Sequence, residues 1–298
     1  MAVYNYADSF SQQLAQKYSR ELVSYELTQS NPQVQFINAQ TIKLPVITLS
    51  GYKDHNRQGT GFNAGTLANS WEPKKLEHDR DIEFAVDPMD VDETNLALSI
   101  ANITNQFEEQ QAIPEKDSYR FSKLYAQATA YAANGAAIDH TALDATNILS
   151  WFDTAMADMD DAGVPEEGRV LYLTAAARKL LKNAQGITRT LSVGAAGVID
   201  RTVHSIDDVT LRTVPSARFK TLYTFTDGCV PAASAKQMNT MLVHPSCVVS
   251  RDKYSYIQVF TPGHDSRTAD KYLYQNRYFT DTFLLQQKAP GIAINADA

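Results

Sequence analysis

The sequence predicts a mixed α+β protein that is organised around a long β-ribbon. Two extended segments, Gln40–Gly51 and Lys75–Val86, flank a polar stretch that is rich in glycine. Amphipathic helical patterns follow the second segment, and beyond them the chain combines a strand–helix unit with several strand-like runs. An isolated two-stranded ribbon is only marginally stable in water. We therefore expect the ribbon to lie across another molecule, most simply a second copy of this chain.

The composition is that of an ordinary globular protein, with 44% hydrophobic and 20% charged residues in a chain of 298. The formal net charge of −7 argues against electrostatic binding of nucleic acid, which requires clustered Lys and Arg. Cys229 and Cys247 are too few for a disulfide framework and are typical of a reducing compartment. No apolar run reaches the roughly 18–20 residues of a membrane span, and the first residues lack the pattern of a secretory signal. These features predict a soluble protein made in a cytoplasm.

The chain begins with an amphipathic segment. Between residues 3 and 30, apolar residues recur at spacings of three and four, which predicts a helix that ends before Pro32. We interpret residues 1–39 as an N-terminal arm and residues 40–88 as an extended loop formed by the ribbon.

The returning arm of the ribbon alternates in character, as a strand with one buried face does. Its apolar residues Ile82, Phe84 and Val86 face one side, and its acidic residues Asp79, Asp81 and Glu83 face the other. The glycine-rich tip includes Gly59–Thr66, which superficially resembles a phosphate-binding loop. Such a loop follows a strand and opens a helix, whereas this one leads into another strand, so we predict a flexible tip.

Two helices are predicted after the ribbon. The stripe of the first consists of Leu96, Ile100, Ile103 and Phe107. The carboxylates over residues 87–93 lack the spacing of a calcium-binding loop and are interpreted as capping the start of this helix. Pro114 is expected to end it, and a second helix is expected to restart at Asp117 or Ser118 and to stop at Gly135.

The rest of the chain predicts an α/β unit followed by strands. A third helix is expected over Ala142–Met159. Val170–Thr174 is typical of a short strand, and Thr174 is expected to cap a helix over Ala175–Ala184. The later strands are predicted at Thr190–Val193, Val209–Val214, Met238–Val249, Tyr254–Phe260, Tyr272–Leu285 and Gly291–Ile294.

No grouping of residues predicts catalysis, a cofactor or a metal. His244 and Cys247 have a spacing that suits a metal, but two ligands make no site, and their apolar surroundings favour core packing. The six histidines are scattered without a triad signature. An α/β enzyme with residues 51–70 as a lid is an alternative, which a small monomer with a saturable ligand would favour.

The order of these elements resembles the major capsid proteins of tailed bacteriophages, which share the Hong Kong 97 fold. The resemblance is carried by the ribbon, by the junction Trp71–Asn95 and by the helix after it. The strand–helix sequence GRVLYLTAAARKLLKN and the segments Ala235–Val249 and Tyr278–Ile294 also look like those chains. The match covers nearly everything after about residue 35.

The resemblance implies a division of the chain beyond the arm and the extended loop. Residues 89–138 and 261–298 would form a peripheral domain with a long spine helix. Residues 139–260 would form an axial domain with a central sheet flanked by helices.

The same resemblance implies a structural protein without enzymatic activity, cofactor or metal. Copies of the chain would assemble into hexamers and pentamers of an icosahedral shell that encloses double-stranded DNA. Because the ribbon starts by residue 40, we expect a separate scaffolding protein in addition to a portal protein and decoration proteins. The expected location is the virion, with assembly in the host bacterial cytoplasm and no membrane contact. A shell of the encapsulin type, which holds enzymes, is the alternative within the same fold.

Residues of the ribbon and its base are the expected contacts between subunits. The candidates are Lys53, Trp71, Lys74, Lys75, Asp79, Arg80, Asp81 and Glu83. An acidic row of this kind is usually a solvated strand face. The alternative is that, in an assembly, the row meets basic residues of a neighbour, such as Arg178, Lys179 or Lys182. Some relatives crosslink subunits through a ribbon lysine and an asparagine, but no matching catalytic carboxylate is identifiable here, and a crosslink is not predicted.

Overall fold

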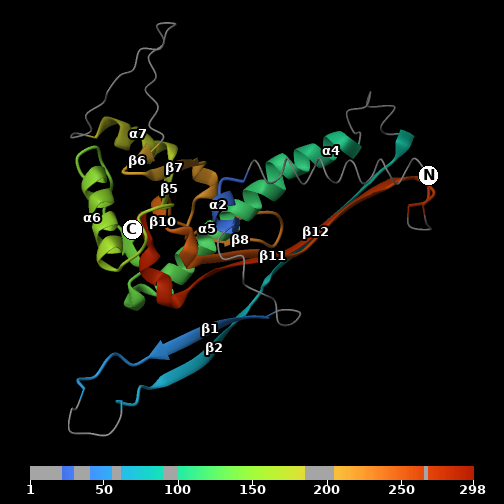
Figure 1. Ribbon diagram of the computed structural model, residues 1–298. Coiled ribbons are helices and arrows are strands. Elements are labelled where there is room, and N and C mark those ends of the chain that lie inside the picture. Colours follow the sequence, from blue (N-terminus) through green and yellow to red (C-terminus); the bar gives the residue numbers. More distant parts are fainter. Residues whose placement is uncertain (1–21, 30–40, 56–61, 90–99, 185–204, 265–267) are drawn as a thin grey trace, which may run out of the picture.

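The described chain has a body with two main β-sheets and a ribbon that projects from it (Figure 1). The computed structural model describes residues 22–29, 41–55, 62–89, 100–184, 205–264 and 268–298. The predicted strand Thr190–Val193, the helix start near Asp90 and most of the N-terminal arm lie outside these residues. Among the described helices, none combines the length and the hydropathy that crossing a membrane requires.

The larger sheet has six strands and forms the centre of one half of the body. Its strands, in spatial order, are β4 (Ala137–Asp139), β13 (Ile292–Ala296), β10 (Met238–Val243), β5 (Val170–Thr174), β7 (Val209–Val214) and β6 (Ser205–Ile206). Strand β5 is buried along its whole length. Val170 and Tyr172 contribute to one hydrophobic cluster, and Leu171 and Leu173 to another. Both faces of this sheet are therefore covered.

Helices α6 (Ile148–Asp161) and α7 (Ala175–Asn183) pack on one of these faces. The predicted cap of α7 is confirmed, because Thr174 Oγ1 accepts a hydrogen bond from the N–H of Ala177 at 3.1 Å. Helix α6 begins later than predicted. Asp144 Oδ1 accepts the N–H groups of Thr146 and Asn147 at 2.7 and 3.0 Å, which closes a turn in place of the expected first helical residues.

The smaller sheet has three antiparallel strands in the order β11 (Val248–Phe260), β12 (Tyr272–Leu284) and β3 (His78–Val86). The predicted single strand Met238–Val249 is wrong, because the turn η4 (Pro245–Cys247) divides it into β10 and β11, which belong to different sheets. Cys247 is buried, as predicted. His244 is half-buried in the turn, where its ring nitrogens lie 2.7 Å from Ser246 Oγ and 3.1 Å from the Glu167 carbonyl.

A continuous helical segment, which we call the spine, covers one face of the smaller sheet (Figure 1). It consists of α4 (Ile100–Phe107), the π-helical turn η1 (Glu108–Ala112) and α5 (Ile113–Ala130). The predicted helix end at Pro114 is therefore wrong. Proline cannot donate to the carbonyl four residues back and clashes with it in a regular α-helix. The wider turn of η1 immediately before Pro114 lets the helix continue past it.

The ribbon pairs differently from the expectation. Strand β1 (Thr41–Leu49) pairs with β2 (Leu67–Lys75), whereas the residues after Glu77 join the body as β3. The alternation of β3 explains this pairing, because Phe84 and Val86 need an apolar partner that the thin ribbon lacks. The sheet backed by the spine supplies that partner.

The described part of the N-terminal segment packs on the body. Leu27 in α2 (Tyr25–Gln29) is fully buried in the main hydrophobic cluster. Ser24 donates through both its backbone N–H and its hydroxyl to the buried Asp117 carboxylate, at 3.2 and 2.7 Å. Arg120 in turn donates to the Ser24 hydroxyl at 3.0 Å. These contacts fix residues 22–29 against the spine.

The sheets do not divide at the predicted domain boundaries. Strand β13 lies in the larger sheet, although it falls within residues 261–298, and β11 lies in the smaller sheet, although it falls within residues 139–260. We propose that the axial part of the chain is the six-stranded sheet with its helices. The peripheral part is then the three-stranded sheet with the spine.

The short elements that remain connect these layers. They are η2 (Ala132–Asn134), η3 (Ser216–Arg218), β8 (Tyr223–Thr224), β9 (Val230–Pro231) and η5 (Gln286–Gly291). Strands β8 and β9 form a hairpin that packs near the spine, and Phe225 of its turn contacts His78 of β3.

Shortening a buried spine residue should destabilise the subunit strongly. Phe121 has no exposed surface and contacts the rings of Tyr172 and Phe219. Phe121→Ala is expected to lower the free energy of unfolding by about 3–5 kcal/mol. Chemical denaturation monitored by circular dichroism measures this. The control Phe62→Ala, at an exposed ribbon position, should change stability by less than about 0.5 kcal/mol, and equal losses for both variants would contradict this packing.

Candidate assembly interface

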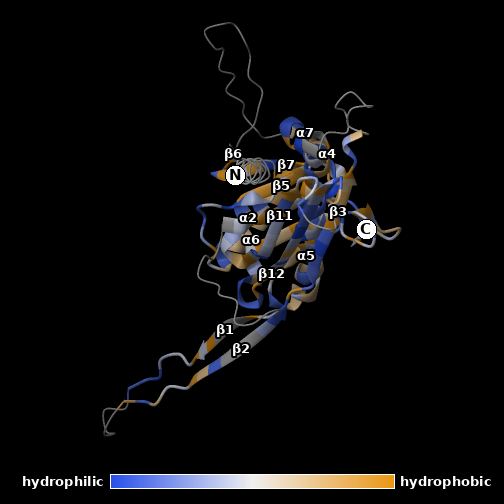
Figure 2. Ribbon diagram, turned by 90° about the vertical axis from the view of Figure 1, so that its right-hand side faces the viewer, coloured by the Kyte–Doolittle hydropathy of each residue, from blue (hydrophilic) through white to orange (hydrophobic). Residues whose placement is uncertain are grey.

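The ribbon carries large apolar side chains that its own chain leaves in contact with solvent. Each of its strands is nine residues long, and hydrophobic residues occur along both strands away from the body (Figure 2). The exposed residues are Ile47, Leu49, Tyr52, Phe62 and Leu67. Leu49 and Leu67 lie directly opposite each other in the antiparallel register, so both belong to one face. An exposed apolar strip of this kind is typical of an interaction surface.

The described part of the tip is held closed by polar contacts. The N–H of Ser50 donates to the Thr66 carbonyl at 3.0 Å, which extends the ribbon pairing by one step. Asn63 Nδ2 donates to the Asp54 carbonyl at 2.7 Å. Lys53, a predicted contact residue, donates through Nζ to the Ala64 carbonyl at 3.2 Å. Its charge therefore lies on the tip itself.

The junction between ribbon and body, residues 76–80, is here called the elbow. Leu76 is buried with Ile42 and Phe283 in a small hydrophobic cluster. The N–H of Glu77 donates at 3.0 Å to Oδ2 of the buried Asp281 carboxylate, and the other oxygen accepts from Tyr119 at 2.9 Å. Burial raises the pKa of Asp281 above its ordinary value. The ribbon is therefore fixed to both β12 and the spine.

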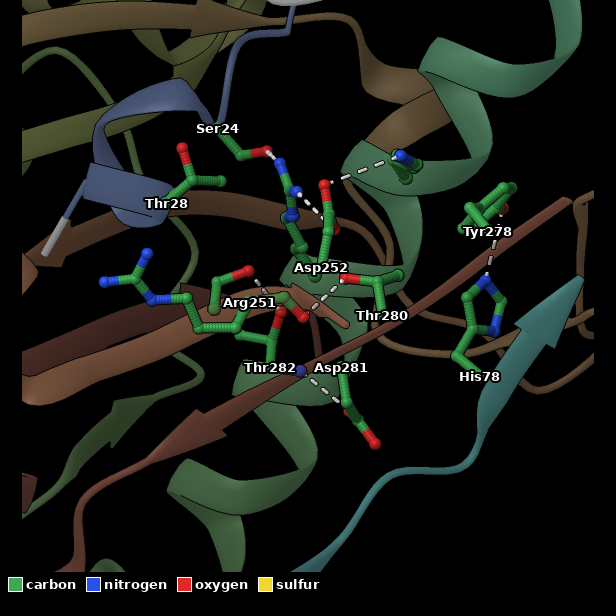
Figure 3. Close-up of polar contacts among 12 residues, drawn as sticks. Ser24, Thr28, His78, Arg251, Asp252, Tyr278, Thr280, Asp281 and Thr282 are labelled. Carbon is green, nitrogen blue, oxygen red and sulfur yellow. Dashed lines mark hydrogen bonds and ion pairs between the residues drawn. The ribbon is translucent and has the colours of Figure 1, made fainter. Parts of the chain in front are cut away.

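His78 extends the elbow into an aromatic cluster. Its ring stacks on Tyr119 at a centroid distance of 3.8 Å and meets the edge of Phe225 at 5.2 Å. Figure 3 shows its Nε2 directed at the Tyr278 hydroxyl, 3.4 Å away. Burial lowers the pKa of His78 from 6.5 to about 3, and the nearby positive charges of Arg80 and Lys123 act in the same direction. The ring is therefore neutral at physiological pH.

Arg80 forms its contacts within its own chain. Its Nε donates to Glu115 Oε1 at 2.7 Å, and its Nη1 donates to the carbonyl oxygen of Phe225. The Tyr278 hydroxyl donates to the same Glu115 oxygen at 2.9 Å. Arg80 thus joins β3 to the spine and to the β8–β9 hairpin, and it adds a second polar contact between the elbow and the spine.

The alternation predicted for β3 is confirmed, because Asp79, Asp81 and Glu83 are all exposed. Arg277 of β12 binds both carboxylate oxygens of Asp79, at 3.1 and 2.7 Å, and this interaction lowers the pKa of Asp79. Gln275 donates to Glu83 at 2.6 Å. Asp81 lies opposite Arg277 in the strand register. Their own sheet therefore offsets part of the repulsion expected within this acidic row.

The remaining candidates lie along β2. Lys74 is half-buried, with Nζ hydrogen-bonded to the Tyr131 hydroxyl and 5.2 Å from the centre of that ring. Lys75 is exposed at the end of the strand. Trp71 pairs with Pro45 across the ribbon, and its side chain lies outside what the structure describes. Arg178, one of the proposed basic partners, donates to Thr213 Oγ1 at 2.7 Å.

Within the described residues, no group of three or more His, Cys, Asp and Glu side chains has the arrangement of a metal site. A surface depression of about 360 Å³ lies beside the elbow. Its lining includes Arg80, Phe84, Phe107, Glu115 and Asn276.

The comparisons with known proteins address the fold. No protein-family model and no curated protein sequence matches the chain. Among solved structures, the mature capsid of bacteriophage PhiM1 matches with a TM-score of 0.60 at 12% identity, over 86% of this chain and 82% of that one. The capsid of cyanophage P-SCSP1u matches with a TM-score of 0.59 at 12% identity, over 91% and 85% of the two chains. The chain has the Hong Kong 97-type capsid fold.

A virus-like particle from Pyrococcus furiosus also matches this capsid fold. Its TM-score is 0.52 at 10% identity, over 98% of this chain and 99% of that one. At such identities the likeness establishes the fold. The mixed α+β class and the architecture expected from the resemblance are thereby confirmed.

Sequence reasoning missed the residues that fix the ribbon to the capsid fold. Asp281 is one of them, and its signal is a lone carboxylate inside the otherwise uncharged run Tyr278–Leu285. A buried strand tolerates such a residue only where it is hydrogen-bonded. Tyr119, Glu115 and Arg277 carry no comparable local signal, because their roles depend on the register of β3 against β12 and the spine.

The buried, neutral His78 makes the stability of the subunit depend on pH. Its pKa in the folded state lies below its unfolded value, so the unfolded chain binds more protons below about pH 6.5. The contribution of His78 to stability should therefore fall as the pH is lowered from 6.5 towards 3, by up to about 1.4 kcal/mol per pH unit. Denaturation curves of the wild type and His78→Gln across this range measure the contribution. Identical pH dependence in the two proteins would contradict it.

Proposed function

We propose that the chain is the structural major capsid protein of a tailed bacteriophage, and that its copies assemble into hexamers and pentamers of an icosahedral shell enclosing double-stranded DNA. The observation that carries the proposal is the combination of a capsid fold with a ribbon that is rigidly attached yet apolar and exposed. The ribbon has no partner surface within its own described chain, and a neighbouring copy would supply one. The proposed role is structural, without catalysis.

The energetics favour assembly through repeated small contacts. Fully burying a Leu or Phe side chain contributes about 1.5–3 kcal/mol before the entropy of association is subtracted. The five exposed apolar residues of the ribbon would supply several such contributions at every junction between subunits. The elbow reduces the entropic cost, because the direction of the ribbon is fixed before the partner arrives. The free energy of each ribbon contact is modest, but a shell contains one such contact for every subunit.

The charge of the chain fits a container for DNA. A formal net charge of −7 disfavours tight binding of polyphosphate to the wall. Such a shell would be located in the virion after assembly in the host bacterial cytoplasm. A separate scaffolding protein, a portal protein and decoration proteins are its proposed partners, and their presence in purified particles is the test.

The likeness to the Pyrococcus furiosus virus-like particle, which spans nearly the whole of both chains, supports a second candidate. In that case the shell would be a protein compartment of the encapsulin type, without a viral genome. Both candidates share the same assembly surface, and they differ in cargo.

Electron microscopy of the purified protein tests the proposal. Closed particles of uniform size are expected, together with rings of six or five subunits as intermediates. A monodisperse small monomer at all concentrations would contradict it. Double-stranded DNA in particles isolated from cells supports the phage capsid, whereas protein-filled particles without DNA support the compartment.

Polar substitutions on the apolar face of the ribbon should impair assembly without unfolding the subunit. In the double variant Leu49→Ser/Leu67→Ser, both side chains are already exposed, so the melting temperature should stay within about 2 °C of the wild type. Particle yield by sedimentation should fall at least about tenfold, because every junction loses apolar contact. The matched control Thr48→Ser/Ala68→Ser alters the directly opposed pair on the other face. Wild-type yield from the leucine variant would contradict the proposed interface.

The acidic row of β3 should add a contribution that depends on salt. Exposed charge pairs are worth only ~0–1 kcal/mol each, and they are screened over ~8–10 Å near physiological ionic strength. Asp81→Lys should leave the melting temperature unchanged, reduce particle yield at low salt, and recover yield as salt is added. Light scattering across a salt series measures this, with Asp161→Lys on the exposed end of α6 as the control. Wild-type yield at every salt concentration would mean that Asp81 faces only water.

A further inference from the structure

The spine contains a buried carboxylate that the assembly interface does not use. Glu108 opens the π-helical turn η1, and only about 4% of its surface is exposed. Its Oε1 accepts hydrogen bonds from the Tyr274 hydroxyl at 3.1 Å and from Asn276 Nδ2 at 2.7 Å. Its Oε2 is also buried and has no hydrogen-bond partner among the described residues. An ionised carboxylate left in this state would be costly, since each buried oxygen requires a donor.

The surroundings of Glu108 are mainly aromatic. The rings of Phe84, Phe107 and Tyr274 lie 5.3–6.3 Å from one another between centroids. Within the described residues, no basic side chain forms an ion pair with Glu108. Burial therefore dominates, and it raises the pKa of Glu108 from 4.5 to about 7, with the two hydrogen bonds opposing part of the effect.

Each element packed near Glu108 carries other titratable or charged groups. Strand β12 carries Tyr274, and β3 carries Arg80, Asp81 and Glu83. The spine carries Glu109 and Glu115, and the β8–β9 hairpin carries Asp227. Arg80 is bound to Glu115, and the acidic residues of β3 lie on the opposite, exposed face of that strand. None of these groups supplies a positive charge that would keep Glu108 ionised.

The backbone at Glu108 is also the least regular part of the spine. The N–H of Ile113 donates to the Glu108 carbonyl, which is the wider hydrogen bond of a π turn. This turn precedes Pro114, which offers no N–H to the turn before it. The side chain that joins this turn to β12 is therefore Glu108 itself, through Tyr274 and Asn276.

We propose that Glu108 acts as a proton-dependent lock between the spine and the three-stranded sheet. With its proton, the neutral carboxyl keeps the π turn against β12. When the proton is lost, a buried charge without a cation remains, and the turn separates more readily from β12. Asn276, Phe84 and Phe107 also line the depression beside the elbow, which gives water access to this layer.

The sign of the effect follows from the raised pKa. Between pH 4.5 and about 7 the folded chain binds a proton that the unfolded chain releases. The stabilisation is therefore fully present below about pH 4.5 and is lost as the pH rises through 7. This direction is opposite to that of His78. In a shell, the spine would be the first layer to loosen at alkaline pH. This consequence rests on the proposed function.

Hydrogen exchange on the purified chain tests the lock. Protection factors of the amides around Ile113 should fall by ~10–100-fold between pH 5 and pH 8 in the wild type, because one unit of pKa shift corresponds to a tenfold change. Glu108→Gln, which is neutral at every pH, should show no fall in protection over this range. The control Glu109→Gln, at the exposed neighbouring position, should keep the wild-type pH dependence.

Equal protection at pH 5 and pH 8 in the wild type, or an unchanged pH dependence in Glu108→Gln, would overturn the lock. If Glu108→Gln does not fold, the carboxyl carbon resonance of Glu108 in the wild type decides, since it should titrate near pH 7. Titration below about pH 5.5 would overturn the proposal. These measurements need no particles, so failure of the lock and failure of shell assembly are separate results.

Discussion

The structure depends most on one partly buried hydrogen bond, from the backbone of Glu77 to the buried Asp281 carboxylate. Asp281 is itself held by Tyr119 of the spine, so this contact joins ribbon, sheet and helix at one point. Leu76 on one side and Arg80 on the other prevent the chain from rotating there. Without this elbow, β1 and β2 would be a marginal hairpin on a flexible tether. With it, the apolar face of the ribbon is presented in one direction.

The two sheets and the spine make the elbow rigid. The larger sheet is covered on both faces, and one of its hydrophobic clusters includes Phe121 and Leu124 of the spine. The β8–β9 hairpin contacts His78 and Arg80 through Phe225. The smaller sheet is backed by the spine, whose π turn lets one long helix continue past Pro114. His78 and Glu108 lie buried in this layer, where burial disfavours the charged form of each, although Glu115 Oε1 lies 3.6 Å from His78 Nε2. Their pKa shifts have opposite effects on stability, so the layer is most stable at intermediate pH.

Much of this arrangement was predictable from local patterns. The strands Val170–Thr174 and Val209–Val214, the cap at Thr174 and the two faces of β3 follow from periodicity and capping, which depend on neighbouring residues alone. The course of the chain after Lys75 was not predictable in this way. It depends on the pairing of β3 with β12 in place of β1, and the paired residues of β3 and β12 lie about 190 positions apart in the sequence. The continuity of the spine past Pro114 likewise depends on a π turn that no local rule specifies. Among the residues of the candidate interface, Asp81 and Lys75 carry a recognisable charge pattern. Asp281 and Tyr119, which fix the elbow, acquire their roles only when distant segments meet.

The central claim is that the ribbon is firmly attached at the elbow and is completed only by a neighbouring copy. Hydrogen exchange measured in parallel on free subunits and assembled particles tests this directly. Amides of residues 47–55 and 62–69 should exchange rapidly in the free subunit and slowly in particles. Amides of the elbow and of α5 should be protected equally in both. Equal exchange of the ribbon in the two states would contradict the claim, because the apolar face would then have gained no partner on assembly.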